Sequence, residues 1–569
     1  YALTPDSSVV VSQLASGNLL VGSTAFAGFT GETGGMLDTT ATDVDVTVGD
    51  DADINVRADN VADADASNTD GDAFATAQVD ETYGLENTGV SVGASGVLTA
   101  DVDVDATASA TTTGASGATA DANADADATN VVAIQDLGNG SNAANSDFSF
   151  GNDATITANA GTSADQVQVS GAATTTTGDA TATADSTLIS GINDVTGTNN
   201  AVSNVLSVGD NGTITGRGYA DVDASATSTT GNATGTATTA AVDGIQADSI
   251  TAGGDAAVKA FANTSSDAVA STTDGDAAAT NTLIASQGLD LDNLSVGGSS
   301  SAGGYDVVGS AIADLTTTAT VGGGGTTDDA DAPADVGSLI GAQFGDGDTN
   351  NAGIGLSVGG AGNLAGSAQL SSDATATAVD GGAEALNLNT VQATGLELSE
   401  TGTIGADSLI SATANVDLDA TATNVGGVDD DAEAAAGADS ISGLNLTTAV
   451  ADLSVGADST VTAAATVAAD ATATSVDGVA EAQAGNFVAT NFDGSATNET
   501  LDVAGAQLGA ADFTAGADAT LNADASVALA ASATSTALTA TADADLNSAI
   551  GVQQTGTTTI GAAGTIDAD

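Results

Sequence analysis

The sequence contains no cysteine and no histidine, and it has almost no basic or aromatic residues. Among 569 residues there are 3 Lys and Arg against 76 Asp and Glu, which gives a formal net charge of −73; aromatic residues make up 2%. The absence of Cys excludes disulfides and thiolate metal sites. The absence of both residue types excludes Cys nucleophiles and His-based acid–base catalysis. We therefore expect that the protein is not an enzyme.

The scarcity of positive charge also excludes several classes of partner. Arg57, Arg217 and Lys259 are the only basic residues, whereas phosphate backbones and anionic membrane surfaces are bound by clustered Lys and Arg. No apolar run approaches the ~18 residues of a membrane-spanning helix. We expect no nucleic acid partner and no membrane span. The chain begins at Tyr1 rather than Met, as after removal of a signal peptide, so we expect a secreted protein, extracellular or at the cell surface.

Small residues in strict alternation are what the sequence has in abundance. Between Thr460 and Thr474, Val and Ala occupy one parity, and Thr and Asp fill most of the other. A period of two indicates β-strands with one apolar and one polar face. Few aromatics and high net charge are typical of disorder, but 41% of the residues are hydrophobic and they alternate rather than scatter. We expect an all-β protein with a thin core of small side chains.

An apolar–polar–apolar–Gly marker recurs along nearly the whole chain. We assign its glycines as Gly49, Gly93, Gly151, Gly209, Gly253, Gly297, Gly359, Gly405, Gly456, Gly505 and Gly561. In most units a second glycine follows the marker by 22 residues, as Gly275 follows Gly253, and the shortest units have 44 residues. This spacing predicts an elongated β-solenoid, similar to a parallel β-helix, with about 22 residues per coil and glycines at its corners. Asp-Gly pairs such as Asp274-Gly275 also fit hairpin turns, so tandem antiparallel β modules are the alternative.

The repeat divides the chain into four segments. Residues 1–45 lack the marker, and we expect them to form a cap on the first strand edge or a strand donated to a neighbouring subunit. Residues 46–320 and 353–569 are predicted to be stacks of β repeats. Between them, 321–352 contains the run Gly322–Gly325 and Pro333, which predicts an irregular loop or a joint.

Acidic ladders are the candidate binding sites. Carboxylates at alternate strand positions point the same way, and stacked coils bring rows of them within ~5 Å of each other. Such rows suit Ca²⁺, which takes several oxygen ligands; the other interpretation is a solvated acidic face that keeps the protein soluble. No other cofactor is expected, and no catalytic residues are assigned. The candidate Ca²⁺ ligands are Asp101, Asp103, Asp105, Asp121, Asp125, Asp127, Asp429, Asp430 and Asp431.

In composition and repeat style the chain resembles secreted prokaryotic surface-layer, sheath and filament proteins, which are acidic, rich in Thr, Ala, Gly and Asp, free of Cys and built from repeated β units. The resemblance implies an extracellular structural protein that self-assembles into a filament, sheath or surface layer. Its partner would be the chain itself, joined through residues 1–40. The alternative is a monomeric adhesin-type stalk or passenger that displays a binding tip. Asn-x-Ser/Thr sequons also permit attached glycans; they begin at Asn139, Asn211, Asn232, Asn263, Asn293, Asn445 and Asn498.

Overall fold

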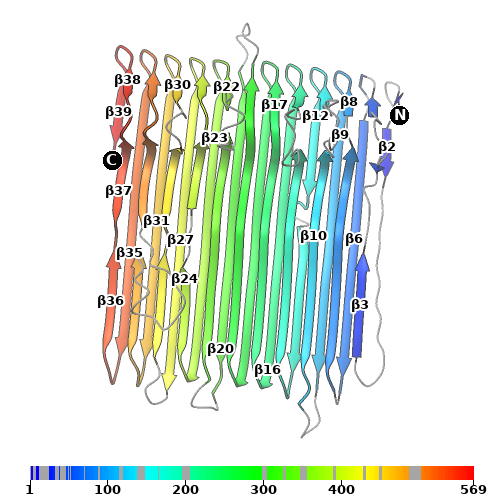
Figure 1. Cartoon of the computed structure of the whole chain (residues 1–569), viewed down its shortest axis with the longest axis vertical. Helices are drawn as coiled ribbons and strands as arrows, with labels where there is room; N and C mark the ends of the chain where they lie inside the picture. Colours follow the sequence, from blue (N-terminus) through cyan, green and yellow to red (C-terminus); the bar gives the residue numbers. More distant parts are fainter. Residues whose placement is uncertain are drawn as a thin grey trace.

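The computed structural model is an all-β solenoid in which every strand pairing is parallel among the described residues. These are residues 2–569 except 4–7, 12–24, 32–36, 39–45, 49, 52, 70, 88–89, 114–118, 137–147, 164–165, 195–204, 298–303, 324–327, 346–354, 389–391, 427–430, 448–451 and 486–500. The strands form two sheets, one of 26 strands (sheet A) and one of 13 (sheet B). Coils follow one another in sequence order from the N-terminal to the C-terminal side, and the longest axis of the molecule runs along the strands (Figure 1).

Sheet B contains one long strand, or two shorter collinear ones, from each coil. Its strands are β2 (Ser8–Val11), β6 (Asp53–Asn68), β9 (Val97–Thr112), β12 (Thr155–Ala160), β13 (Val167–Thr175), β16 (Thr213–Thr230), β18 (Ala257–Asp274), β20 (Asp306–Val321), β23 (Asn363–Asp380), β27 (Leu409–Gly426), β31 (Thr460–Ser475), β35 (Thr520–Ser535) and β39 (Thr565–Ala568).

Sheet A receives the return half of each coil, divided into up to three strands. They are β1 (Ala2–Leu3), β3 (Ala25–Gly31), β4 (Leu37–Asp38), β5 (Val46–Val48), β7 (Ala73–Asn87), β8 (Val90–Val92), β10 (Ala122–Asp136), β11 (Phe148–Phe150), β14 (Ala180–Asp194), β15 (Val205–Val208), β17 (Ala233–Ala252), β19 (Ala277–Val296), β21 (Ala330–Phe344), β22 (Leu356–Val358), β24 (Ala383–Leu388), β25 (Gln392–Leu398), β26 (Gly402–Ile404), β28 (Ala432–Gly437), β29 (Ser440–Leu446), β30 (Leu453–Val455), β32 (Ala480–Gly485), β33 (Asp502–Gly509), β34 (Phe513–Ala515), β36 (Ala540–Asp545), β37 (Ser548–Gln554) and β38 (Thr558–Ile560).

The strand register confirms the parallel solenoid and corrects the length of its coil. Ala233 of β17 pairs with Ala277 of β19, 44 residues later, and Thr213 of β16 pairs with Ala257 of β18 at the same distance. One coil therefore takes at least 44 residues, and the expected value of 22 is wrong. The 22-residue spacing marks half a coil, because the second glycine turns the chain from sheet B into sheet A. The antiparallel alternative is excluded for the described strands, which all pair in parallel.

The marker glycines occupy the other corner, where sheet A returns to sheet B. Two residues after most of them the backbone has positive φ at a non-glycine residue, such as Asn211 (φ 57°) and Asp255 (φ 57°), and the Gly212 N–H bonds to the Gly209 carbonyl. This is a tight turn, and Asn and Asp tolerate its left-handed residue better than most side chains. The prediction that marker glycines form corners is therefore confirmed at these positions.

One marker was assigned to the wrong glycine. Phe513–Ala515 pairs with Leu453–Val455, so the corner glycine of that coil is Gly516, not Gly505. The sequence Leu501-Asp-Val-Ala-Gly505 resembles the marker with one extra residue, and it precedes the true corner because this coil carries an insertion between Gly485 and Leu501. Gly505 lies instead at a bend of sheet A.

The expected joint at 321–352 is also corrected. Residues 330–344 of this segment form β21, which pairs with β19 on one side and with β24 and β25 on the other. On sheet B, β20 pairs with β23 over almost its whole length. Pro333 is in register with Leu386 of β24, whereas the pairing with β19 skips residues 332 and 333, so the missing proline N–H is tolerated on that side. The two predicted stacks are one continuous stack.

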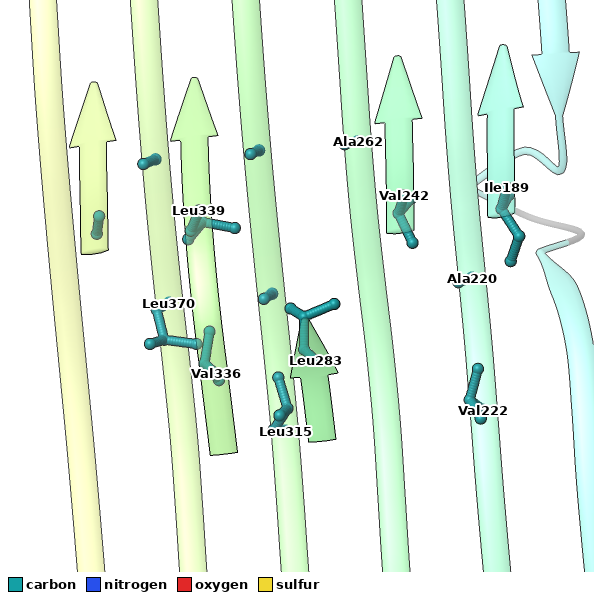
Figure 2. Packing of buried hydrophobic residues seen from close by; sticks show 14 of the residues in the cluster. Ile189, Ala220, Val222, Val242, Ala262, Leu283, Leu315, Val336, Leu339 and Leu370 are labelled. Carbon is teal, nitrogen blue, oxygen red and sulfur yellow. The ribbon is translucent and has the colours of Figure 1, made fainter. Parts of the chain in front are cut away.

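The core lies between the two sheets and is built mainly from Ala, Val, Leu and Ile. Strands such as β9 alternate buried and half-buried residues along their full length, which confirms the expected thin core of small side chains. Figure 2 shows Leu315 of β20 packed beside Leu283 of β19, and Val222 of β16 below Ala220. Along the stack, Leu315 is followed in register by Ser372, Leu418, Ala469 and Leu529. Large and small residues thus alternate within one column, as close packing requires.

A column of glycines brings the two sheets into main-chain contact. A Cβ on Gly244 would lie 2.3 Å from the Phe261 nitrogen of sheet B and 2.5 Å from the Gly288 oxygen of the next coil. Gly288, Gly341 and Gly395 repeat this crowding one coil after another. Because no side chain fits, only glycine permits the bend of sheet A at this level.

Candidate functional site

Asp101, Asp103 and Asp105 project from β9 on the outer face of sheet B, and of the three only Asp103 has a carboxylate beside it in register, Asp59 of β6. Asp101 lies in register between Arg57 and Asn159, and Asn159 Nδ2 donates to Asp101 Oδ1 at 2.7 Å. Asp105 lies between Val61 and Gln168. The expected rows are therefore broken by cationic, amide and apolar residues.

Asp103 and Asp105 border a hollow of about 550 Å³ beside the interruption between β12 and β13. Its carboxylates are Asp59, Asp103, Asp105 and Asp221, and Gln166 and Gln168 add amides. Arg57 Nε bonds to Asp59 Oδ1 at 2.9 Å, and Arg57 Nη2 lies 3.9 Å from Asp103 Oδ2. The described lining thus offers carboxylate and amide oxygens that can accept hydrogen bonds and attract cations.

Asp121 has a structural partner that the sequence did not reveal. Its Oδ1 accepts the Asp179 N–H of the next coil at 3.0 Å, and its own N–H donates to Asp72 Oδ1 at 3.1 Å. The same bond repeats from coil to coil at the corner that follows sheet B. We call this row the Asx ladder: Asp72, Asp121, Asp179, Asn232, Asp276 and Asp329. Much of the acidity at this corner therefore satisfies backbone N–H groups.

The remaining candidate ligands are dispersed. Asp127 of β10 lies in register with Asp185 of β14 and accepts a bond from Gln78 Nε2 at 3.3 Å; burial and the Asp185 and Asp125 charges raise its pKa. Asp431 is exposed and lies at the same corner position as the Asx ladder, where it accepts the Val479 N–H of the next coil at 2.8 Å. Asp429 and Asp430 lie outside the described residues. Within the part of the chain that the structure describes, no group of three acidic side chains has the arrangement of a metal site.

A polar row on the outer face of sheet A was missed by the sequence analysis. It follows the glycine column, one Asn, Gln, Asp or Glu per coil, and we call it the amide row: Gln135, Asn193, Gln246, Asp290, Gln343, Glu397, Asn445, Gln507 and Gln553. Gln246 Nε2 donates to Asp290 Oδ2 at 3.3 Å. The recurring sequence Gly–apolar–amide or acid was the available signal, but it was hidden by the more frequent marker.

One carboxylate beside the amide row is buried. Asp243 is 3% exposed, and burial together with the Asp290 charge raises its pKa to about 8. Among the described residues no hydrogen bond reaches its carboxylate. Other outer-face carboxylates shift in the same direction: burial and the Asp221 and Asp267 charges raise the pKa of Asp223 to about 6.

The last coil, β35 to β38, presents an open edge. Among the described strands, β36, β37 and β38 pair on one side only, and β39 covers just Thr520–Ala523 of β35. The inward residues Val527, Leu529 and Ala531 are only partly buried, and Leu538 is 52% exposed. At the other end, β2, β3 and β4 pair with β6 and β7 of their own chain. A cap on the first coil has this arrangement, while donation to a neighbour remains a prediction.

Comparisons with protein-family models, with curated proteins and with solved structures found no match. No helix in the described structure is long and apolar enough to cross a membrane.

Proposed function

We propose that this chain is an extracellular structural protein that self-assembles end to end into a filament, sheath or layer. The observation that carries the proposal is the open edge of the last coil, with its unpaired strands and exposed apolar residues. Exposed parallel strand edges are templates for further pairing. An assembly that extends the stack would bury this edge by the same contacts that hold neighbouring coils together.

A second copy of the chain supplies strands in matching positions. Following the register from coil to coil, Ala25 of β3 corresponds to Ala540 of β36, and Leu37 of β4 corresponds to Leu85 and finally to Val552 of β37. The N-terminal strands of a neighbouring copy can therefore extend sheet A across the junction. Thr520–Ala523 already pairs with β39, so a neighbour's β2 would have to displace β39 or stay unpaired. Because each contact joins different surfaces, repetition gives an open polymer.

Charge sets the conditions for this assembly. At a net charge of −73, like charges repel across any junction, and this repulsion is reduced when the Debye length falls to about 3 Å at 1 M salt. We expect polymers at high ionic strength and fewer at low ionic strength.

The experiment compares the chain with a variant blocked at the edge. The Ala480 N–H donates to the Thr539 carbonyl next to β36, and Ala480 is in register with Ala540. By strand alternation the Ala540 and Ala542 N–H groups point to the open edge, where a neighbour's β3 would pair, so Ala542→Pro removes a donor that only a neighbour would use. We expect negative-stain microscopy and sedimentation at 1 M NaCl to show polymers for the chain and monomers for Ala542→Pro, with matching circular dichroism.

Two results would overturn the proposal. One is a chain that stays monomeric at 1 M salt, which is also the behaviour expected of an isolated adhesin-type stalk. The other is a folded Ala542→Pro variant that polymerises as well as the unmodified chain.

A further inference from the structure

Two adjacent strands of sheet A place four oxygen-bearing side chains in a rectangle. In register, Asp243 of β17 pairs with Gln287 of β19, and Gln246 of β17 pairs with Asp290 of β19. Neighbouring parallel strands lie about 4.8 Å apart. The two carboxylates therefore lie on one diagonal, and the two carboxamides lie on the other.

The bend at the glycine column makes this arrangement possible. Residues 243 and 246 are three apart and would face opposite sides of a regular strand. Gly244 is left out of the pairing between β17 and β19, and its missing side chain lets the main chain approach Phe261 of sheet B. Such an irregularity shifts the alternation of side chains along a strand. Residues 243 and 246 of β17 therefore face the same side of the sheet, and so do residues 287 and 290 of β19.

Hydrogen bonds orient the two amides of the rectangle. Gln246 donates its Nε2 to Asp290 Oδ2, and Gln287 donates its Nε2 to Gln343 Oε1 at 3.2 Å. The Gln287 amide nitrogen points away from β17, which leaves its Oε1 on the side of the rectangle. Gln246 points its amide nitrogen into the rectangle toward Asp290, so its own oxygen points away from β19. Asp243 is 3% exposed, and no hydrogen bond among the described residues reaches its carboxylate. An unpaired buried carboxylate is costly unless a cation or a donor compensates it.

We propose that Asp243, Gln287 and Asp290 form a Ca²⁺ site between β17 and β19, with Gln246 positioning Asp290 through its hydrogen bond. Two carboxylates balance the charge of a divalent ion, and carboxylate, carboxamide and water oxygens are the ligands that Ca²⁺ prefers. The rectangle is particular to this pair of coils. In the position of Asp243, the preceding coil has Ser190, and the coil after Gln287 has Ile340. The site is distinct from the acidic ladders of sheet B and does not depend on assembly.

The test is a Ca²⁺ titration of the full chain by calorimetry in 1 M NaCl, where weak binding to the acidic surface is suppressed. We expect one saturable site in the unmodified chain, no such site in Asp243→Asn, and at least tenfold weaker binding in Asp290→Asn. The matched control is Asp524→Asn, which removes one charge from the exposed last coil and should leave the site unchanged. Ca²⁺ should also raise the melting temperature of the chain and of the control, but not that of Asp243→Asn.

Absence of a saturable site in the unmodified chain would overturn the proposal. An unchanged isotherm in Asp243→Asn would also overturn it, because Asp243 would then be a buried neutral acid rather than a ligand. If Asp243→Asn fails to fold, Asp290→Asn and Gln287→Ala give the same test from the half-buried side of the rectangle.

Discussion

The central coils and the last coil have the same sequence pattern and very different burial. In β20, Leu315 is fully buried between sheets that continue on both sides, whereas Leu529, at the equivalent position of β35, is only partly buried. The alternation of inward-facing and outward-facing residues is the same in both strands. Burial in this solenoid is thus a property of the neighbouring coil, as expected for repeat architectures in which each unit contacts only its neighbours. Substitutions at equivalent positions of the two regions therefore measure what a covering coil contributes.

Removing a large core side chain should give the largest difference in stability loss between the central coils and the last coil. We expect Leu315→Ala to lower the free energy of unfolding by about 3 kcal/mol, because it leaves a cavity in a closed core. Leu529→Ala should cost about 1 kcal/mol in the monomer, since part of that side chain already contacts solvent. Urea denaturation of both variants in low salt measures the difference. Equal losses would mean that the last coil is covered in solution.

The glycine column gives a second comparison. A Cβ at Gly244 would approach main-chain atoms to 2.3 Å, while at Gly551 in the last coil the nearest atom is at 2.9 Å. We expect Gly244→Ala to cost about 2–3 kcal/mol through overpacking and Gly551→Ala roughly half as much, because the end coil can relax. Melting temperatures of the two variants test this, and a tolerated Gly244→Ala would contradict main-chain contact between the sheets.

The sequence predicted the class of fold because strand alternation and corner glycines are local signals. It underestimated the number of residues per coil because Gly253 and Gly275 both mark corners. The spacing between glycines alone does not say whether one corner or two complete a coil. The register of Ala233 with Ala277 decides that question, and it depends on contacts between distant residues. Gly505 was misassigned for a similar reason, since glycines of corners and of the bend share one short motif.

The candidate ligands were less predictable than the fold. The sequence showed that Asp101 and Asp121 lie in alternating runs, but not that Asn159 and the Asp179 N–H are their partners. Those partners come from coils 58 residues away, and insertions make the separation variable. Asp243 was overlooked because it is a single acid rather than part of a run. Its burial follows from the tertiary bend at Gly244.

The Asx ladder should contribute less than the core. Asp179 accepts the Asn232 N–H at 2.9 Å, and we expect Asp179→Ala to cost about 1 kcal/mol, the typical value of such a bond. Asp179→Asn keeps an acceptor oxygen and removes one negative charge, so it should be neutral or slightly stabilising. Thermal melts of the pair distinguish hydrogen bonding from charge. A larger loss in Asp179→Asn than in Asp179→Ala would contradict the ladder's role. The last coil has Thr539 at the corresponding position and lacks this contribution.

The smallest expected effect is the pH dependence of stability contributed by Asp223. In contrast to ordinary acid denaturation, this contribution increases the stability of the fold as the pH decreases. Burial, Asp221 and Asp267 raise the pKa of Asp223 to about 6, above its value of about 3.9 in an unfolded chain. The folded state therefore binds the proton more tightly, so stability falls as pH rises through 6 and is recovered as pH decreases toward 4. Because Asp223 is only partly buried, solvent screening should keep its contribution below about 1 kcal/mol.

Asp223→Asn should raise the melting temperature at pH 7.5 and reduce the gain in melting temperature between pH 7.5 and pH 5. Asp524→Asn on the last coil serves as the control for loss of one charge. If both variants shift the pH profile equally, the effect belongs to the net charge of the chain rather than to the crowded carboxylates of the central coils.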